Sequence, residues 1–223
     1  MAVLNIGWKS LARVAPKTVA VTTPKEGESA SEPAEKVPAP RADKPMLVYV
    51  ASPTPAEGFD KVEKVVLTED KIVIGSKAFT CVRMSDEQAA QDPILAAAGK
   101  ETPRIVIISA DYQDVESIEG DKISIGRMWD AMKASYKAHY KGDLEKMTKS
   151  MLKVLGEFDK IANERKILEE KKSRAEKPSD ADKKEWDKEA KELAEREKDA
   201  NAERDALLKL ERKQDEKAAK DAA

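Results

Sequence analysis

The side chains that could carry out chemistry are few, because the chain has a single cysteine, Cys81, and a single histidine, His139. Cys81 lies inside the apolar run 78–84, where a free cysteine usually packs as a small hydrophobic residue. His139 falls late in an amphipathic segment, so we expect a surface or half-buried position. The two residues are too far apart in sequence for a recognisable zinc spacing. The sequence therefore predicts no catalytic residue, no metal site and no cofactor.

Two further patterns also lack the spacing that chemistry needs. No glycine-rich phosphate-binding loop is present, and one distant histidine cannot complete a Ser–His–Asp nucleophile set. An acidic group around a turn lacks the spacing and the central glycine of a calcium loop, so it is predicted to be a solvated loop: Asp111, Asp114, Glu116, Glu119 and Asp121.

Composition limits the function classes further. Charged residues make up 38 % of the 223 residues and aromatic residues only 4 %, so the whole chain cannot be packed core. Residues 143–223 carry 23 acidic and 22 basic side chains, leaving 20 and 19 in residues 1–142. Neither part has the cationic excess of a nucleic-acid-binding protein. No apolar run is long enough to span a bilayer, and one cysteine favours a reducing compartment. We predict a soluble, cytoplasmic protein.

The elements that must position these residues alternate between strands and helices in residues 44–142. Buried strands are predicted at 44–50, 78–84 and 104–108, and an edge strand at 114–118. Helices are predicted at 59–67, 92–98 and 127–140; the second begins with Asp92-Pro93, a helix start signal, and ends at Gly99. The order β-α-β-α-β-β-α predicts the α/β class.

The first buried strand, Lys44-Pro45-Met46-Leu47-Val48-Tyr49-Val50, and the later Thr102-Pro103 step before Ile105-Val106-Ile107-Ile108 resemble the thioredoxin-like fold. The resemblance implies a mixed sheet flanked by helices, a cis bond before Pro103, and contact of Thr102 and Pro103 with an extended peptide. It also implies a redox turn at 53–58, where Thr54 and Glu57 stand near the positions of the usual cysteines. A thiol–disulfide exchanger needs a thiolate there, so the sequence argues against that chemistry.

The amino-terminal part divides into two segments. Residues 15–43 are rich in proline and are predicted to be a disordered linker. In residues 1–14, Leu4, Trp8 and Leu11 have helical spacing, and no acidic residue precedes Glu26. This segment is interpreted as a frayed tail, as a short docking peptide, or as a targeting segment.

From Asp143 onward, residues 143–223 are predicted to form an antiparallel coiled-coil hairpin of two helices. The first helix has an apolar seam with 3-4 spacing, and Lys177-Pro178-Ser179-Asp180 interrupts it with a turn and a cap. Positions facing each other in such a hairpin have residue numbers of one constant sum, which gives the layers Met147 with Leu207, Val154 with Ala200, Ile161 with Leu193, Leu168 with Trp186, and Leu144 with Leu210. The same register predicts that Arg196 contacts the ring of Phe158 and that Arg165 pairs with Glu189, and it sets Met151 against Glu203.

The sequence favours a non-catalytic interaction or scaffold protein. A protein partner of unknown identity is expected at the groove beside Pro103 and on the helical hairpin. Two alternatives stay open: a thiol–disulfide oxidoreductase working through Cys81 or a partner's thiol, and a chaperone-like holdase using the helices. The position of Cys81 tests the redox alternative, because burial in the sheet argues against redox chemistry and exposure beside Pro103 favours it. The oligomeric state is not predicted.

Overall fold

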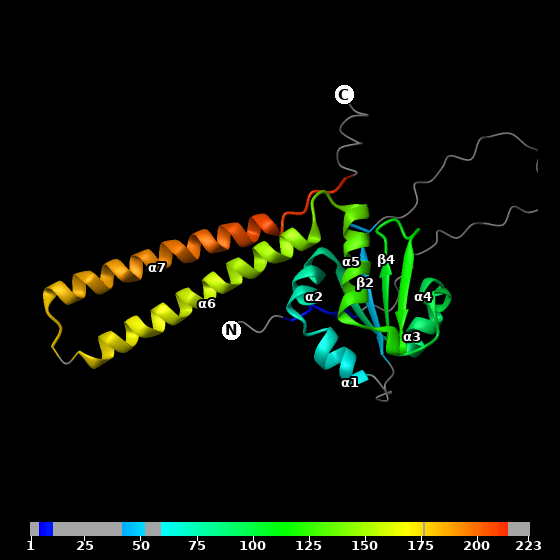
Figure 1. Cartoon of the computed structure of the whole chain (residues 1–223), viewed down its shortest axis with the longest axis horizontal. Coiled ribbons are helices and arrows are strands. Elements are labelled where there is room, and N and C mark those ends of the chain that lie inside the picture. The colour runs from blue at the N-terminus through cyan, green and yellow to red at the C-terminus, as the bar shows by residue number, and fades with distance from the viewer. Residues whose placement is uncertain (1–4, 11–41, 52–58, 176, 214–223) are drawn as a thin grey trace, which may run out of the picture. The chain divides into compact units, whose positions relative to one another are not determined.

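The computed structural model describes residues 5–10, 42–51, 59–175 and 177–213, which fall into two compact units (Figure 1). One unit runs from Ile6 to His139 and contains the β-sheet. The other contains the chain from Tyr140 onward. The predicted redox turn with Thr54 and Glu57 lies outside the described residues, as does the predicted linker except for Ala42 and Asp43.

The first unit is built on a mixed sheet of five strands in the order β1-β3-β2-β4-β5. β1, β3 and β2 are parallel, whereas β4 runs antiparallel to β2, and β5 antiparallel to β4. The expected strands at 44–50, 78–84, 104–108 and 114–118 are confirmed with shifted ends. The observed bounds are β1 Lys9–Ser10, β2 Met46–Ala51, β3 Thr80–Ser85, β4 Arg104–Ile108 and β5 Val115–Glu119.

Short helices connect these strands. The cap predicted for α4 is confirmed, because the Asp92 carboxylate accepts hydrogen bonds from the amides of Ile94 and Leu95, with Pro93 at the first helical position. The segment predicted as one helix at 59–67 begins as α1 and continues as a π-helix. The helical bounds are α1 Phe59–Lys61, the π-helix Val62–Val66, α2 Asp70–Gly75, a 3₁₀ turn Ser76–Ala78, α3 Asp86–Gln91, α4 Pro93–Ala98, a 3₁₀ turn Gly120–Lys122 and α5 Ile125–His139.

Alternation along the strands divides the core between the two faces of the sheet. Val48 of β2 and Val106 of β4 lie on one face with Ala89 of α3 and Leu95 of α4. The intervening residues, such as Leu47 and Ile105, are fully buried on the other face. α5 packs against β4, β5 and α2. The first unit therefore has three layers, with helices on both faces of the sheet.

The second unit contains two long helices, α6 (Leu144–Arg174) and α7 (Asp180–Leu207), each about 45 Å long. The capping box predicted at the turn is confirmed, since Ser179 and Asp182 exchange hydrogen bonds through their side chains and amides. α7 ends at Leu207, so the predicted helical layer of Leu144 with Leu210 is wrong. Instead the chain turns, and the amide of Lys141 donates to the carbonyl of Glu211 at 2.8 Å.

In the part of the chain that the structure describes, no helix combines the length and apolar character needed to cross a membrane.

Candidate functional site

The Thr102–Pro103 step lies at the beginning of β4, and its peptide bond is cis, as the resemblance implies. The ladder between β2 and β4 ends at the pair Val50–Arg104. Pro103 is buried and its carbonyl accepts a hydrogen bond from the amide of Gly120 at 2.9 Å. Thr102 is half-buried, and no hydrogen bond within the described residues reaches its backbone. This backbone can therefore pair with another extended chain.

Arg104 holds the segment that leads into this step. Its side chain is 3 % exposed, although it carries a charge. Its Nη1 donates to the carbonyl of Glu101 at 3.3 Å, and its Nη2 donates to the carbonyl of Leu95 at 3.4 Å. Burial lowers the pKa of the guanidinium, an effect that the nearby Glu119 opposes. Arg104 thus joins the loop before Thr102 to α4.

Gly99, which ends α4, is the other fixed point of this loop. It has a φ of +152°, a value that side chains rarely permit. A Cβ at this position would also collide with the carboxylate of Glu119. The φ of Gly99 therefore favours glycine here, and a side chain would in addition displace the carboxylate of Glu119.

Cys81 lies away from Thr102–Pro103, at the opposite end of the strands. It pairs with Leu47, which in turn pairs with Ile107, so the thiol and Pro103 are separated by about 13 Å along the strand direction. The side chain is 4 % exposed, and its Sγ donates to the carbonyl of Ser76 at 3.4 Å. Burial raises the pKa of the thiol to about 11, so the thiol is protonated at neutral pH. His139 is half-buried, as expected.

A second cluster surrounds Tyr49, which is fully buried in the central strand β2. The guanidinium of Arg83 lies 5.4 Å from its ring centroid, and the ring of Trp8 lies 5.9 Å away at a tilt of 43°. Arg83 also forms an ion pair of 2.8 Å with Glu63 of the π-helix. Burial, followed by the Glu63 carboxylate, raises the pKa of Tyr49. Sequence analysis missed this cluster.

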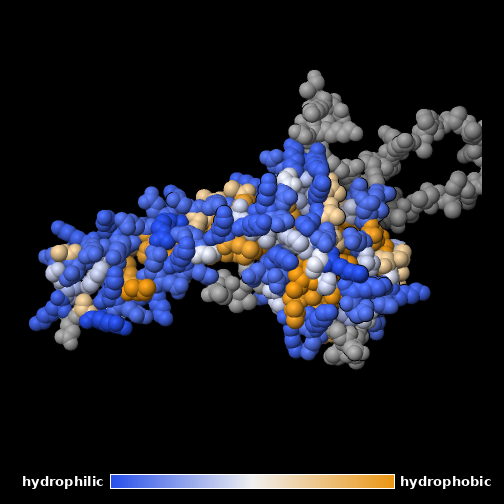
Figure 2. All heavy atoms as spheres, in the orientation of Figure 1, coloured by the Kyte–Doolittle hydropathy of each residue, from blue (hydrophilic) through white to orange (hydrophobic). Residues whose placement is uncertain are grey.

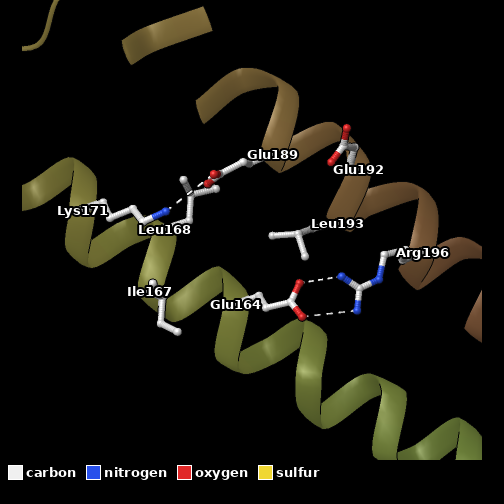
Figure 3. Close-up of a pocket in the computed structure, with 8 residues that line it drawn as sticks. All are labelled: Glu164, Ile167, Leu168, Lys171, Glu189, Glu192, Leu193 and Arg196. Carbon is white, nitrogen blue, oxygen red and sulfur yellow. Dashed lines mark hydrogen bonds and ion pairs between the residues drawn. The ribbon is translucent and has the colours of Figure 1, made fainter. Parts of the chain in front are cut away.

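The helical hairpin has a groove of about 270 Å³ between α6 and α7 (Figure 3). Leu168 and Leu193 lie at its centre, and with Ile161 they form a buried cluster against which Trp186 and Ala190 pack. Charged side chains flank the apolar centre. The residues that line the groove are Glu164, Ile167, Leu168, Lys171, Glu189, Glu192, Leu193 and Arg196.

Ion pairs across the groove differ from the predicted ones. Arg196 forms hydrogen-bonded ion pairs with both Glu164 and Glu157, at 2.6 Å to the latter, so its predicted contact with Phe158 is wrong. Arg204 instead lies 6.0 Å from the Phe158 ring. The predicted pair of Arg165 with Glu189 is also wrong, because Arg165 pairs with Glu197 at 2.6 Å and Lys171 pairs with Glu189 at 3.5 Å. Two carboxylates one heptad apart offer Arg196 stronger partners than an aromatic ring.

The predicted hairpin positions differ in exposure. The first helix contributes the buried residues Met147, Val154, Ile161 and Leu168, and the second contributes Leu193 and Ala200. Trp186 and Leu207 are half-buried, and Glu203, set against Met151, is exposed. On the face drawn in Figure 2, hydrophilic side chains cover most of both helices and the apolar areas are small. Ile167 is the most exposed of the large apolar residues on α6, at 54 %.

Comparison with models of protein families, with curated proteins and with solved structures found no match to this chain.

Proposed function

We propose that this chain is a non-catalytic interaction or scaffold protein. A thioredoxin-like domain binds an extended polypeptide beside Thr102 and Pro103, and an antiparallel coiled-coil hairpin supplies a second contact surface. The order of β2, α1, β3, α4, β4, β5 and α5 along the chain supports the first assignment. The apolar centre between α6 and α7, flanked by ion pairs, supports the second.

One observation carries the proposal: the backbone of Thr102 continues β4 beyond the last ladder pair, Val50–Arg104. A backbone amide and carbonyl with no partner in the described chain must be satisfied by water or by a ligand. An extended polypeptide satisfies both groups by strand addition. Arg104 and Gly99 fix the loop, so the binding backbone is held in place before a ligand arrives.

The state of Cys81 supports a binding role over a redox one. A nucleophilic cysteine needs a lowered pKa and access to solvent, whereas Cys81 is buried and its pKa is raised to about 11. No observation on the helices favours the holdase alternative.

A peptide library displayed on phage and selected on the full-length protein tests the proposal. The affinity of the enriched peptides for the wild type is compared with that for Thr102→Arg, which places a large side chain at the binding backbone. The matched control is Thr68→Arg, the same change at an exposed residue. We expect Thr102→Arg to weaken binding by at least about tenfold and Thr68→Arg by less than about twofold.

Hydrogen exchange on the complex with the best peptide gives a second measurement. Protection of residues 101–104 is expected. Protection confined to residues 143–213, with equal affinity for both variants, would place the binding surface on the helical hairpin and refute the role of Thr102.

A further inference from the structure

As far as the structure describes the amino-terminal segment, a two-residue strand, β1 (Lys9–Ser10), covers the edge of β3. In the described part of the chain, the ladder between β1 and β3 has two positions, since Lys9 pairs with Val82 and Ser10 with Arg83. β3 itself spans six residues, and all six pair with β2 on its other side. Within the described residues, most of this edge of β3 is therefore unpaired, which is the situation that favours strand addition.

Two side chains anchor this segment to the domain. Ile6 is 7 % exposed, and the ring of Trp8 packs on Tyr49 at 5.9 Å. The amide of Trp8 donates to the carbonyl of Ile6 at 3.0 Å, which forms a tight turn at Gly7. The segment thus presents an apolar residue and, two positions later, an aromatic one.

The surface beside Trp8 is formed by residues of β2, β3 and the π-helix. The register places Tyr49 beside Arg83, and the Arg83 guanidinium lies 5.4 Å from the centroid of the Tyr49 ring. Glu63 of the π-helix forms an ion pair with Arg83. A ring that reaches this surface meets an aromatic face and a nearby cation, the two neighbours that bind aromatic side chains well. The surface therefore selects an aromatic residue.

Among the residues that the structure describes, β1 and β3 share two pairs, and so short a ladder opens at low free-energy cost. The connection through residues 11–41 keeps the segment tethered to Ala42, whose amide bonds the carbonyl of Ala110 at 2.7 Å. A tether gives an intramolecular ligand an effective concentration on the order of millimolar. A free competitor must overcome this advantage.

We propose that residues 6–10 are a displaceable internal strand, and that the β3 edge accepts in their place an extended segment of a partner protein with an apolar residue two positions before an aromatic one. A longer partner strand can pair along more of β3 than Lys9 and Ser10 do, and this compensates for the tether. The same segment from a second copy of the chain has no such gain and competes at a disadvantage. This surface is distinct from the one beside Thr102.

The probe is a fluorescein-labelled peptide with the sequence of residues 4–11, and its binding to the full-length protein is measured by fluorescence anisotropy. In the variant Ile6→Asp/Trp8→Ala the internal strand loses both anchors, whereas the β3 edge is intact. We expect the peptide to bind this variant at least about tenfold more tightly than the wild type. Gly7→Ala is the matched control, because a Cβ at Gly7 meets nothing within 4 Å; it should behave as the wild type.

A disulfide between positions 9 and 82 gives an independent test that does not require the open variant to fold and that leaves Arg83 in place. Lys9 and Val82 are paired in the ladder, so Lys9→Cys/Val82→Cys in a Cys81→Ser background should lock the strand in place. Peptide binding should be lost in the oxidised protein and restored by reduction.

Equal binding by the locked and reduced forms, or no binding by a folded open variant, would overturn the proposal. A dimer of the wild type that disappears in the open variant, without peptide binding, would make a second copy the occupant and would also overturn it. Neither outcome depends on Thr102→Arg, so this test is separate from that of the proposed function.

Discussion

Arg104 and Glu119 are directly paired across β4 and β5, yet the Arg104 guanidinium donates to two backbone carbonyls, those of Leu95 and Glu101. The buried cation thus serves the backbone around α4 and the loop that precedes Thr102. Glu119 contributes in another way, since its carboxylate occupies the space beside Gly99.

Replacing Arg104 should destabilise the first unit. Arg104→Ala removes the donor from two carbonyls and leaves a cavity, so we expect a loss of about 2–4 kcal/mol in the free energy of unfolding. Arg104→Lys keeps the charge but has no planar fork to reach both carbonyls, and it should lose about 1–2 kcal/mol. Urea unfolding measures both values. The exposed Arg127→Ala is the control; an equal effect in all three variants would contradict the assigned role.

The Cys81 thiol should be inert in the folded protein. Because only the thiolate attacks disulfide reagents, and burial raises the pKa of Cys81 to about 11, reaction with Ellman's reagent near neutral pH should proceed only as fast as the protein opens. Addition of urea should accelerate it sharply. Rapid stoichiometric reaction of the native protein would contradict the burial of this thiol.

The raised pKa of Cys81 also predicts that the folded protein loses stability at alkaline pH. Its folded-state pKa is about 11, against 9.0 for an unperturbed thiol, so the unfolded chain loses the proton first. The stabilising contribution is complete below about pH 9 and is lost as the pH rises from 9 to 11. A difference of about two pKa units corresponds to about 2–3 kcal/mol. The free energy of unfolding of the wild type minus that of Cys81→Ser should therefore fall over this range, and identical pH profiles would refute the assignment.

Truncation of two adjacent residues on α6 should affect stability to very different extents. Leu168 is 4 % exposed and lies in the cluster with Leu193, so Leu168→Ala should reduce the stability of the helical hairpin by about 2–4 kcal/mol. Ile167 is 54 % exposed, so Ile167→Ala should change it by less than about 0.5 kcal/mol. Urea unfolding followed by circular dichroism gives the comparison. Equal effects would show that the seam does not pack as described.

The register of the helical hairpin can be tested chemically. Lys171 Nζ and Glu189 Oε1 are 3.5 Å apart, a distance at which a carbodiimide can join them as an amide. The product should appear in monomeric protein by mass spectrometry and should disappear in Lys171→Arg. Formation of this link only between two chains would replace the hairpin by an intermolecular pair of helices.

Much of the first unit could be predicted because its strands are continuous apolar runs. Met46–Val50 and Ile105–Ile108 are buried on both faces, and such runs leave few alternatives. α3 (Asp86–Gln91) was missed because it buries only Ala89, although the Ser85–Gln88 capping box was a usable signal. β1 was not predicted, since the spacing of Leu4, Trp8 and Leu11 gave no sign of a strand. Its pairing with β3 is a tertiary contact that local spacing cannot show.

The candidate site was predictable only where the backbone determines it. Thr102–Pro103 is a local motif, whereas Arg104 would be expected on the surface by its charge, and only the fold reveals the carbonyls that it contacts. In the helical hairpin, the apolar spacing predicted the buried positions of α6 and those of Leu193 and Ala200, whereas Trp186 and Leu207 are only half-buried. The partner of Arg196 depends on how far the two helices are shifted along each other, and a constant-sum rule does not resolve shifts of less than one heptad.

The hydrogen bond from Lys141 to Glu211 means that the helical hairpin leaves and rejoins the chain at a single point. Its entry and exit are as close as two neighbouring strands, about 5 Å, the geometry in which whole elements are inserted into surface loops of other proteins. We therefore expect that residues 141–211, grafted into a tight turn of an unrelated host, would extend its reach by about 45 Å without forcing that turn apart.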